Sequence, residues 1–99
     1  MLRYALSKIR SFADRETEGV YHRRPSRRFA GFARAAFTKL VMIDNARRVE
    51  ELMQPPGNRL EKLRGDRQGA WSIRINEQWR ICFEWENGNA DRVEIVDYH

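Results

Sequence analysis

The sequence predicts an α+β domain in which N-terminal helices pack on one face of a small antiparallel sheet. Two observations lead to this fold class. Apolar residues recur every three or four positions between residues 29 and 53, and this spacing is typical of helices. After residue 70 they recur at every second position, as in half-buried strands. Because the helices and the sheet each expose one apolar face, we expect the two faces to cover each other.

The clearest pattern lies in two alternating runs, residues 71–76 and 79–85. Their apolar side chains fall on one side and are Trp71, Ile73, Ile75, Trp79, Ile81, Phe83 and Trp85. The shared phase favours core packing of the tryptophans over a role as stacking platforms. Asn87-Gly88 predicts a two-residue hairpin turn, because both residues tolerate positive φ. A last strand over residues 93–99 completes an antiparallel meander.

Capping residues predict two helices in the first half of the chain. Asp14 is the expected N-cap of a short helix over residues 15–22. Ser26 is the expected N-cap of a long helix that runs to Asp44. The apolar stripe of the long helix consists of Phe29, Phe32, Ala33, Ala36, Phe37, Leu40 and Ile43.

A second helix of a helical hairpin is expected after Asn45, which serves as its N-cap. The apolar residues that should point inward are Val49, Leu52 and Met53. The run Pro55-Pro56-Gly57 should end this helix, since proline lacks the backbone N–H. Residues 9–12 are expected to form a short first strand, and residues 58–63 a strand or extended segment that enters the meander.

Length and composition indicate one domain. Ninety-nine residues with 41% hydrophobic content are enough for a single core. Residues 1–8 show no pattern and are interpreted as an N-terminal extension, with the domain spanning residues 9–99. The net charge of +5 favours a polyanion or an acidic protein as partner.

The cysteine content and the hydropathy pattern indicate where in the cell the protein is located. The single cysteine, Cys82, excludes an internal disulfide and fits a reducing environment. No apolar run approaches the roughly 18 residues of a membrane span. We therefore expect a cytoplasmic protein that makes no contact with a membrane. Two histidines far apart in the sequence argue against a zinc site, and no cofactor or metal is expected.

Four arginines of the meander are the first candidate site. Arg74 and Arg80 should project from the sheet face that the helices leave open, with Arg64 and Arg67 at one edge of it. Guanidinium groups hold phosphate bidentately and neutralise its charge. The alternative interpretation is an ordinary solvated sheet face.

The chain end is the second candidate. The last strand should carry Asp97, Tyr98 and His99 on a fixed platform, where the imidazole is an acid or base and the phenol can stack on a nucleotide base. Glu61 is a third candidate, because a carboxylate can be the general base of a ribonuclease that uses the 2′-hydroxyl. The alternatives are a polar tail and an ordinary acid at a strand edge.

Together these segments resemble the HigB branch of the RelE/ParE toxin superfamily. The resemblance rests on Leu63–Asn76, Gln78–Phe83 and Val93–His99, with support from residues 9–12 and 55–60. It implies a RelE-like fold, similar to microbial ribonucleases, and the toxin half of a type II toxin–antitoxin pair. Such toxins cleave mRNA in the ribosomal A site without a metal. The implied partners are the ribosome with its mRNA, a helix-turn-helix antitoxin (HigA-like), and operator DNA through that antitoxin.

The resemblance also implies site residues. The family's catalytic positions are matched here by Arg64, Arg80, Asp97, Tyr98 and His99. Some members carry a histidine where this chain has Glu61, so this position departs from the family. Arg67 and Arg74 are expected to contact RNA.

The leading hypothesis is therefore a ribosome-dependent mRNA endonuclease in which Arg64 and Arg80 brace the scissile phosphate. His99 would exchange a proton with the attacking or leaving oxygen, and Glu61 is the candidate for the other proton. Two alternatives remain open: a ParE-like inhibitor of DNA gyrase, and a non-catalytic binding partner of an antitoxin in a repressor complex.

Overall fold

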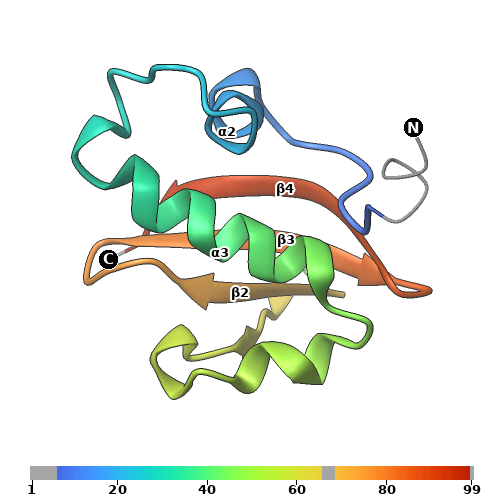
Figure 1. Ribbon diagram of the computed structural model, residues 1–99. Coiled ribbons are helices and arrows are strands. Elements are labelled where there is room, and N and C mark those ends of the chain that lie inside the picture. The colour runs from blue at the N-terminus through green and yellow to red at the C-terminus, as the bar shows by residue number, and fades with distance from the viewer. Residues whose placement is uncertain (1–6, 66–68, 99) are drawn as a thin grey trace.

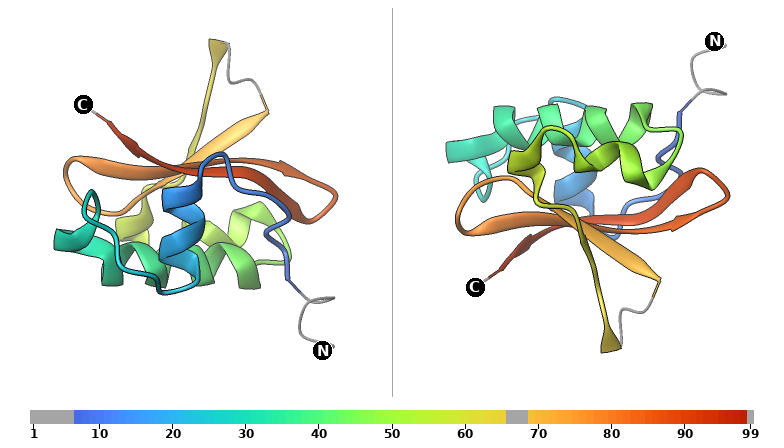
Figure 2. Two further views of the ribbon diagram at one scale, coloured as in Figure 1. Left: turned by 90° about the horizontal axis from the view of Figure 1, so that it is seen from above. Right: turned by 90° about the horizontal axis from the view of Figure 1, so that it is seen from below.

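A computed structural model of the chain describes residues 7–65 and 69–98 (Figure 1). Helices α2 (Arg15–Tyr21) and α3 (Ala33–Asn45) lie on one face of a four-stranded sheet. Figure 2 shows that the β1–β2 pair and the C-terminal end of β4 turn toward the other side. The predicted α+β class is confirmed. None of the helices in the described ranges has the length and hydrophobicity that a membrane span requires.

The sheet is an antiparallel meander in the order β1-β2-β3-β4. Its strands are β1 (Glu61–Lys62), β2 (Ala70–Arg74), β3 (Trp79–Glu86) and β4 (Asn89–Asp97). The turn between β3 and β4 is Asn87-Gly88, with φ values of 53° and 78°. Both residues are thus in the left-handed region, as the sequence predicted for this hairpin.

The core lies between the sheet and α3. Strand residues Ile73, Ile81 and Ile95 stand side by side in the ladder and are buried. They pack against apolar residues of the helical layer, namely Phe29, Ala36, Leu40 and Ile43. Trp79 stacks on Phe32 with a ring separation of 5.1 Å and meets Phe29 edge-on at 5.5 Å. The core-packing interpretation of the tryptophans is confirmed, since all three pack against this cluster.

The first helix follows its prediction, and the second begins later than predicted. The Asp14 carboxylate accepts a hydrogen bond of 2.6 Å from the N–H of Thr17 and caps α2. Ser26 caps a single turn instead of a helix, because its hydroxyl accepts from the N–H of Phe29 at 3.1 Å. A 3₁₀ helix, η1 (Ala30–Phe32), follows, and the regular helix begins only at Ala33. The predicted start at residue 26 is therefore wrong.

The second helix of the predicted hairpin is also wrong. Asn45 is the last residue of α3, and the following segment forms the 3₁₀ helices η2 (Val49–Met53) and η3 (Pro56–Asn58). The buried side-chain amide of Asn58 donates to the carbonyl oxygens of Leu52 and Gln54 at 3.1 and 3.2 Å. Because Asn58 satisfies these carbonyls, the chain needs no further helical turn there. Met53 is 58% exposed, although it was predicted to point inward.

The segment before α2 runs beside β4. Residues 9–12, predicted as a short strand, form only two isolated parallel bridges, Ile9 with Ala90 and Phe12 with Val93. Residues 58–63 contain the two-residue strand β1. The boundary between an extension and a domain after residue 8 stays a prediction.

Asp44 of α3 fastens the N-terminal segment to the helical layer. Its carboxylate accepts from the hydroxyls of Ser7 and Tyr21, each at 2.6 Å, and from the N–H groups of Lys8 and Ile9 at 2.9 and 3.1 Å. Burial opposes ionisation, but these hydrogen bonds outweigh it and lower the pKa of Asp44. The ionised carboxylate is therefore the form that the fold stabilises.

Replacing Asp44 with asparagine is expected to lower the free energy of unfolding by about 2 kcal/mol at pH 7, because several charge-assisted hydrogen bonds weaken together. A lowered folded pKa contributes stability above the unfolded value of 3.8, and this contribution is lost as the pH falls through the folded pKa. Urea unfolding of both proteins should thus show a difference that shrinks below about pH 4. A difference that stays constant down to pH 2 would contradict this role of the carboxylate.

Candidate active site

Arg80 lies at the centre of the sheet face that the helices do not cover. It belongs to β3, where alternation places Ile81 in the core and Arg80 on the opposite face. The residue is nevertheless only 7% exposed, because β1 and neighbouring segments cover it. Its Nε donates to the hydroxyl of Ser72 at 2.8 Å, and its Nη2 donates to the carbonyl oxygens of Ser72 (3.3 Å) and Arg59. The guanidinium is therefore held in one orientation by strand β2 and by the turn before β1.

The other terminal nitrogen of Arg80 has a different environment. Among residues 7–65 and 69–98, no hydrogen bond involves Nη1 of Arg80. Because Nε and Nη2 are occupied, Nη1 is the nitrogen that remains to donate to a further acceptor. A guanidinium that is held in one orientation and keeps one nitrogen without an acceptor is suited to bind an oxyanion.

Two further predicted site residues lie beside Arg80. Glu61 of β1 places one carboxylate oxygen 4.0 Å from Nη2 of Arg80, and its side chain is 53% exposed. The centre of the Tyr98 ring lies 5.4 Å from the guanidinium carbon of Arg80, and Tyr98 is 41% exposed. The N–H of Tyr98 donates to the carbonyl of Gln78 at 2.7 Å, which fixes the backbone at the end of β4. An acid, a cation and an aromatic ring from three separate segments thus meet on one face.

The positive charge on this face is only weakly compensated. Arg74 and Arg80 are directly opposite each other on β2 and β3, so two cations share the same face. Arg74 donates from Nε to the carbonyl of Asn76 at 3.0 Å. The contact with Glu61 is long and half-exposed, and ion pairs of this kind contribute about 0–1 kcal/mol. An incoming polyanion can therefore replace this carboxylate at little cost.

Two other predicted site residues, Arg64 and Asp97, belong to the described part of the chain. Arg64 is exposed beyond β1. Asp97 pairs with Trp79 in the ladder, so alternation directs it to the face opposite Arg80, where it accepts from the side chain of Gln78 at 3.1 Å. Arg67 and His99 lie outside the described residues.

Sequence reasoning missed two residues that hold Arg80, namely Ser72 and Arg59. Ser72 is fully buried, and its place among the alternating residues of β2 gave a signal: it is a small hydroxyl on the face that also carries the arginines. Arg59 contributes only a backbone carbonyl, which its left-handed conformation (φ 44°) turns toward Arg80. No side-chain pattern in the sequence reports such a carbonyl.

Comparison with known proteins decides the family. A family model described as a RelE-like toxin of the type II toxin–antitoxin system HigB matches residues 10–99. The chain belongs to the HigB-like toxin family. Its relatives in the family include Toxin HigB-1 of Vibrio cholerae serotype O1, which is 46% identical over 56 residues, and Endoribonuclease HigB of Proteus vulgaris, which is 41% identical over 61 residues. The alignments cover 57% and 62% of this chain.

The alignments with these two relatives of the HigB-like family are partial. They span 59% and 65% of the relatives' own lengths, which is less than two thirds of either protein. A solved structure of the YoeB dimer from Staphylococcus aureus matches with a TM-score of 0.55 at 16% identity, covering 95% of this chain and 98% of that chain. At this identity the likeness concerns the fold alone, which is shared across nearly the whole chain.

Proposed function

We propose that this chain is the toxin of a type II toxin–antitoxin pair and that it cleaves mRNA on the translating ribosome without a metal. The observation that carries the proposal is the fixed guanidinium of Arg80, with a carboxylate and an exposed phenol beside it on an open basic face. Membership of the HigB-like toxin family supports it. The printed name of the Proteus vulgaris relative, an endoribonuclease, supports the reaction type.

The two arginines at the centre and edge of the face act on the phosphate. Attack by a 2′ oxygen on the neighbouring phosphorus gathers negative charge on the two non-bridging oxygens of the transition state. Arg80 meets this charge through Nη1 in a site from which neighbouring segments partly exclude water, where such interactions gain strength. Arg64, exposed beyond β1, adds a second cation when RNA is bound.

Two proton transfers accompany the reaction. A base removes the proton of the 2′ hydroxyl as the new O–P bond forms, and an acid protonates the 5′ oxygen as its bond to phosphorus breaks. The products are a 2′,3′-cyclic phosphate and a 5′ hydroxyl. We assign protonation of the 5′ oxygen to His99 and removal of the 2′ proton to Glu61. The carboxylate of Glu61 already lies 4.0 Å from Nη2 of Arg80.

The other residues position the RNA. Tyr98 offers a half-exposed ring on which a base can stack, a contact worth about 1–3 kcal/mol. Arg74 and Arg67 contact the RNA backbone, and Asp97 fixes the end of β4 through Gln78. The protein partners in this proposal are the ribosome and a helix-turn-helix antitoxin that neutralises the toxin and represses the shared operon.

The decisive experiment is primer extension on a defined mRNA after the chain is induced, with and without translating ribosomes. Cuts inside codons that require translation are the expected result. A catalytically impaired Arg80→Ala variant, induced to the same level, is the matched control for cuts made by host nucleases.

Two other outcomes would replace this proposal. An intact mRNA pool together with DNA damage would indicate a gyrase inhibitor of the ParE type. An intact pool without DNA damage, combined with tight antitoxin binding, would indicate a non-catalytic partner in a repressor complex.

Ser72 is expected to act as a positioning residue through its bond to Arg80. Valine and threonine have the same shape, so Ser72→Val and Ser72→Thr differ only in the hydroxyl. We expect Ser72→Val to cleave about tenfold more slowly than Ser72→Thr, mainly in kcat, because a net hydrogen bond of about 1–1.5 kcal/mol to Nε is lost. Single-turnover rates and melting temperatures of both variants check this. Equal rates for the two would exclude a role for the hydroxyl.

A further inference from the structure

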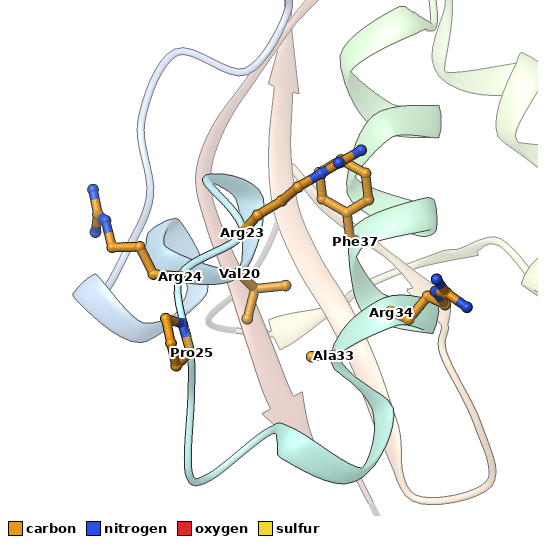
Figure 3. A pocket seen from close by; sticks show the side chains of 7 residues that line it. All are labelled: Val20, Arg23, Arg24, Pro25, Ala33, Arg34 and Phe37. Atoms are coloured by element: carbon orange, nitrogen blue, oxygen red, sulfur yellow. The ribbon is translucent and has the colours of Figure 1, made fainter.

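A second candidate site lies on the helical side of the molecule, away from Arg80. A pocket of about 400 Å³ opens where the end of α2 meets the first turns of α3 (Figure 3). The residues that line it are Val20, Arg23, Arg24, Pro25, Ala33, Arg34 and Phe37. Its size falls within the range of about 300–1,000 Å³ that is usual for ligand pockets.

The walls combine an apolar floor with a basic rim. Val20 is buried and Phe37 is half-buried, whereas the three arginines are exposed. Within the part of the chain that the structure describes, none of these arginines forms an ion pair and none of the lining residues is acidic. Figure 3 shows the guanidinium of Arg23 over the Phe37 ring, whereas the side chains of Arg24 and Arg34 point outward on opposite sides of the pocket. Three cations without acidic partners that flank an apolar floor attract an anionic group that carries an apolar side chain.

The backbone at Arg23 is the second observation. Arg23 has a φ of 62° and ends α2 through two bonds, from its N–H to the carbonyl of Val20 (3.0 Å) and from the N–H of Arg24 to the carbonyl of Gly19 (2.8 Å). Glycine is the usual residue at this position of a helix end, because other residues are strained there. The chain instead has an arginine whose guanidinium carbon lies 4.4 Å from the centre of the Phe37 ring. Arg23 thus has a strained backbone and places its own guanidinium at the pocket. Strained residues often mark binding sites.

We propose that this pocket binds an acidic peptide segment of a protein partner and takes one of its apolar side chains. The carboxylates would pair with the guanidinium groups of Arg23, Arg24 and Arg34, and the apolar side chain would enter between Val20, Ala33 and Phe37. RNA fits less well, because Arg23 lies over the face of the Phe37 ring on which a flat base would stack, whereas a smaller aliphatic side chain would need only the space beside the ring (Figure 3). The inference does not depend on RNA cleavage, since the sheet separates the pocket from Arg80.

The test uses the full chain and a short labelled peptide of glutamates and serines with one central leucine. Fluorescence anisotropy measures its affinity beside two comparison probes. One is the same peptide with serine in place of leucine, and the other is an oligouridine of equal charge. We expect the leucine peptide to bind at least about fivefold more tightly than either probe, because only it matches both the floor and the rim.

Three variants locate the binding site on the protein. Arg34→Glu is expected to lower the affinity for the leucine peptide at least about tenfold. Arg23→Gly should weaken it about threefold while it keeps or raises the melting temperature, because glycine relieves the strained φ. Arg15→Glu is the control: it changes the net charge of the protein by the same amount as Arg34→Glu, but Arg15 lies on α2 outside the pocket. It should change the affinity for the leucine peptide less than about twofold at physiological salt.

Several results would overturn the proposal. Equal affinity for the leucine and serine peptides would mean that charge alone binds, without the pocket. Tighter binding of oligouridine, lost in Arg34→Glu, would assign the pocket to RNA. Equal losses of peptide affinity in Arg34→Glu and Arg15→Glu would show that binding depends on the net charge of the protein and not on the pocket. Both pocket variants should retain RNA cleavage, so failure here and failure of the proposed nuclease activity are distinguishable.

Discussion

Replacing Arg80 with alanine is expected to reduce mRNA cleavage by at least about a hundredfold, which is the usual effect of removing a donor that stabilises transition-state charge. The physical reason is geometric as well as electrostatic. Ser72 and the carbonyl of Arg59 hold the guanidinium before the substrate arrives, so no reorganisation is needed when charge develops. The measurement is the single-turnover cleavage rate of a defined mRNA on translating ribosomes.

Controls must separate chemistry from folding, because Arg80 is buried and its removal leaves the Ser72 hydroxyl and the Arg59 carbonyl without a donor. This loss is expected to lower stability by about 1–3 kcal/mol. Arg80→Lys keeps the charge but not the planar fork, and should retain more activity than alanine yet cleave about tenfold more slowly than the wild type. Arg74→Ala removes the neighbouring cation and should reduce the cleavage rate less than Arg80→Lys or Arg80→Ala. A folded Arg80→Ala protein with full activity would refute the assignment.

Replacing His99 with alanine is expected to reduce cleavage by about a hundredfold or more, because positioned acids and bases contribute about 10²–10⁴ in rate. Glu61→Gln should reduce it about tenfold, since a half-exposed carboxylate gains less from its surroundings. Both rates are measured on ribosomes programmed with the same mRNA. The ratio of the two losses in cleavage rate shows which residue contributes more to catalysis.

A modified substrate distinguishes the two protons. When sulfur replaces the 5′ oxygen at the cut site, the leaving group departs without an acid. If His99 protonates the 5′ oxygen, the loss in His99→Ala should nearly vanish with this substrate, whereas the loss in Glu61→Gln should remain. The reverse pattern would exchange the two roles. Unchanged losses in both variants would show that neither residue is the acid.

The two faces of the fold divide the expected functions. The open sheet face carries Arg80 with Glu61 and Tyr98, and the helical face carries the basic pocket around Arg23 and Arg34. Since the sheet lies between them, a partner in the pocket need not cover the candidate active site. A variant on one face is therefore expected to leave the other face's measurement unchanged.

The sequence by itself determined the features that depend on neighbouring residues. Alternation in residues 71–76 and 79–85 predicted two of the strands and the side that faces the core. Asn87-Gly88 predicted the hairpin, and Asp14 predicted the start of α2. Each of these signals is local, because side-chain period, positive φ and capping all act within a few residues.

Only the tertiary structure decided what depends on distant segments. Ser26 and Asn45 looked like helix caps. Ser26 caps only a single turn, so α3 begins later, and the helix predicted after Asn45 is replaced by 3₁₀ helices around the buried amide of Asn58. The burial of Arg80 and its contact with the Arg59 carbonyl, 21 residues away in the chain, required the β1 turn to fold over the sheet. Hydrogen-bond partners of this kind follow from packing, and no local pattern of residue types encodes them.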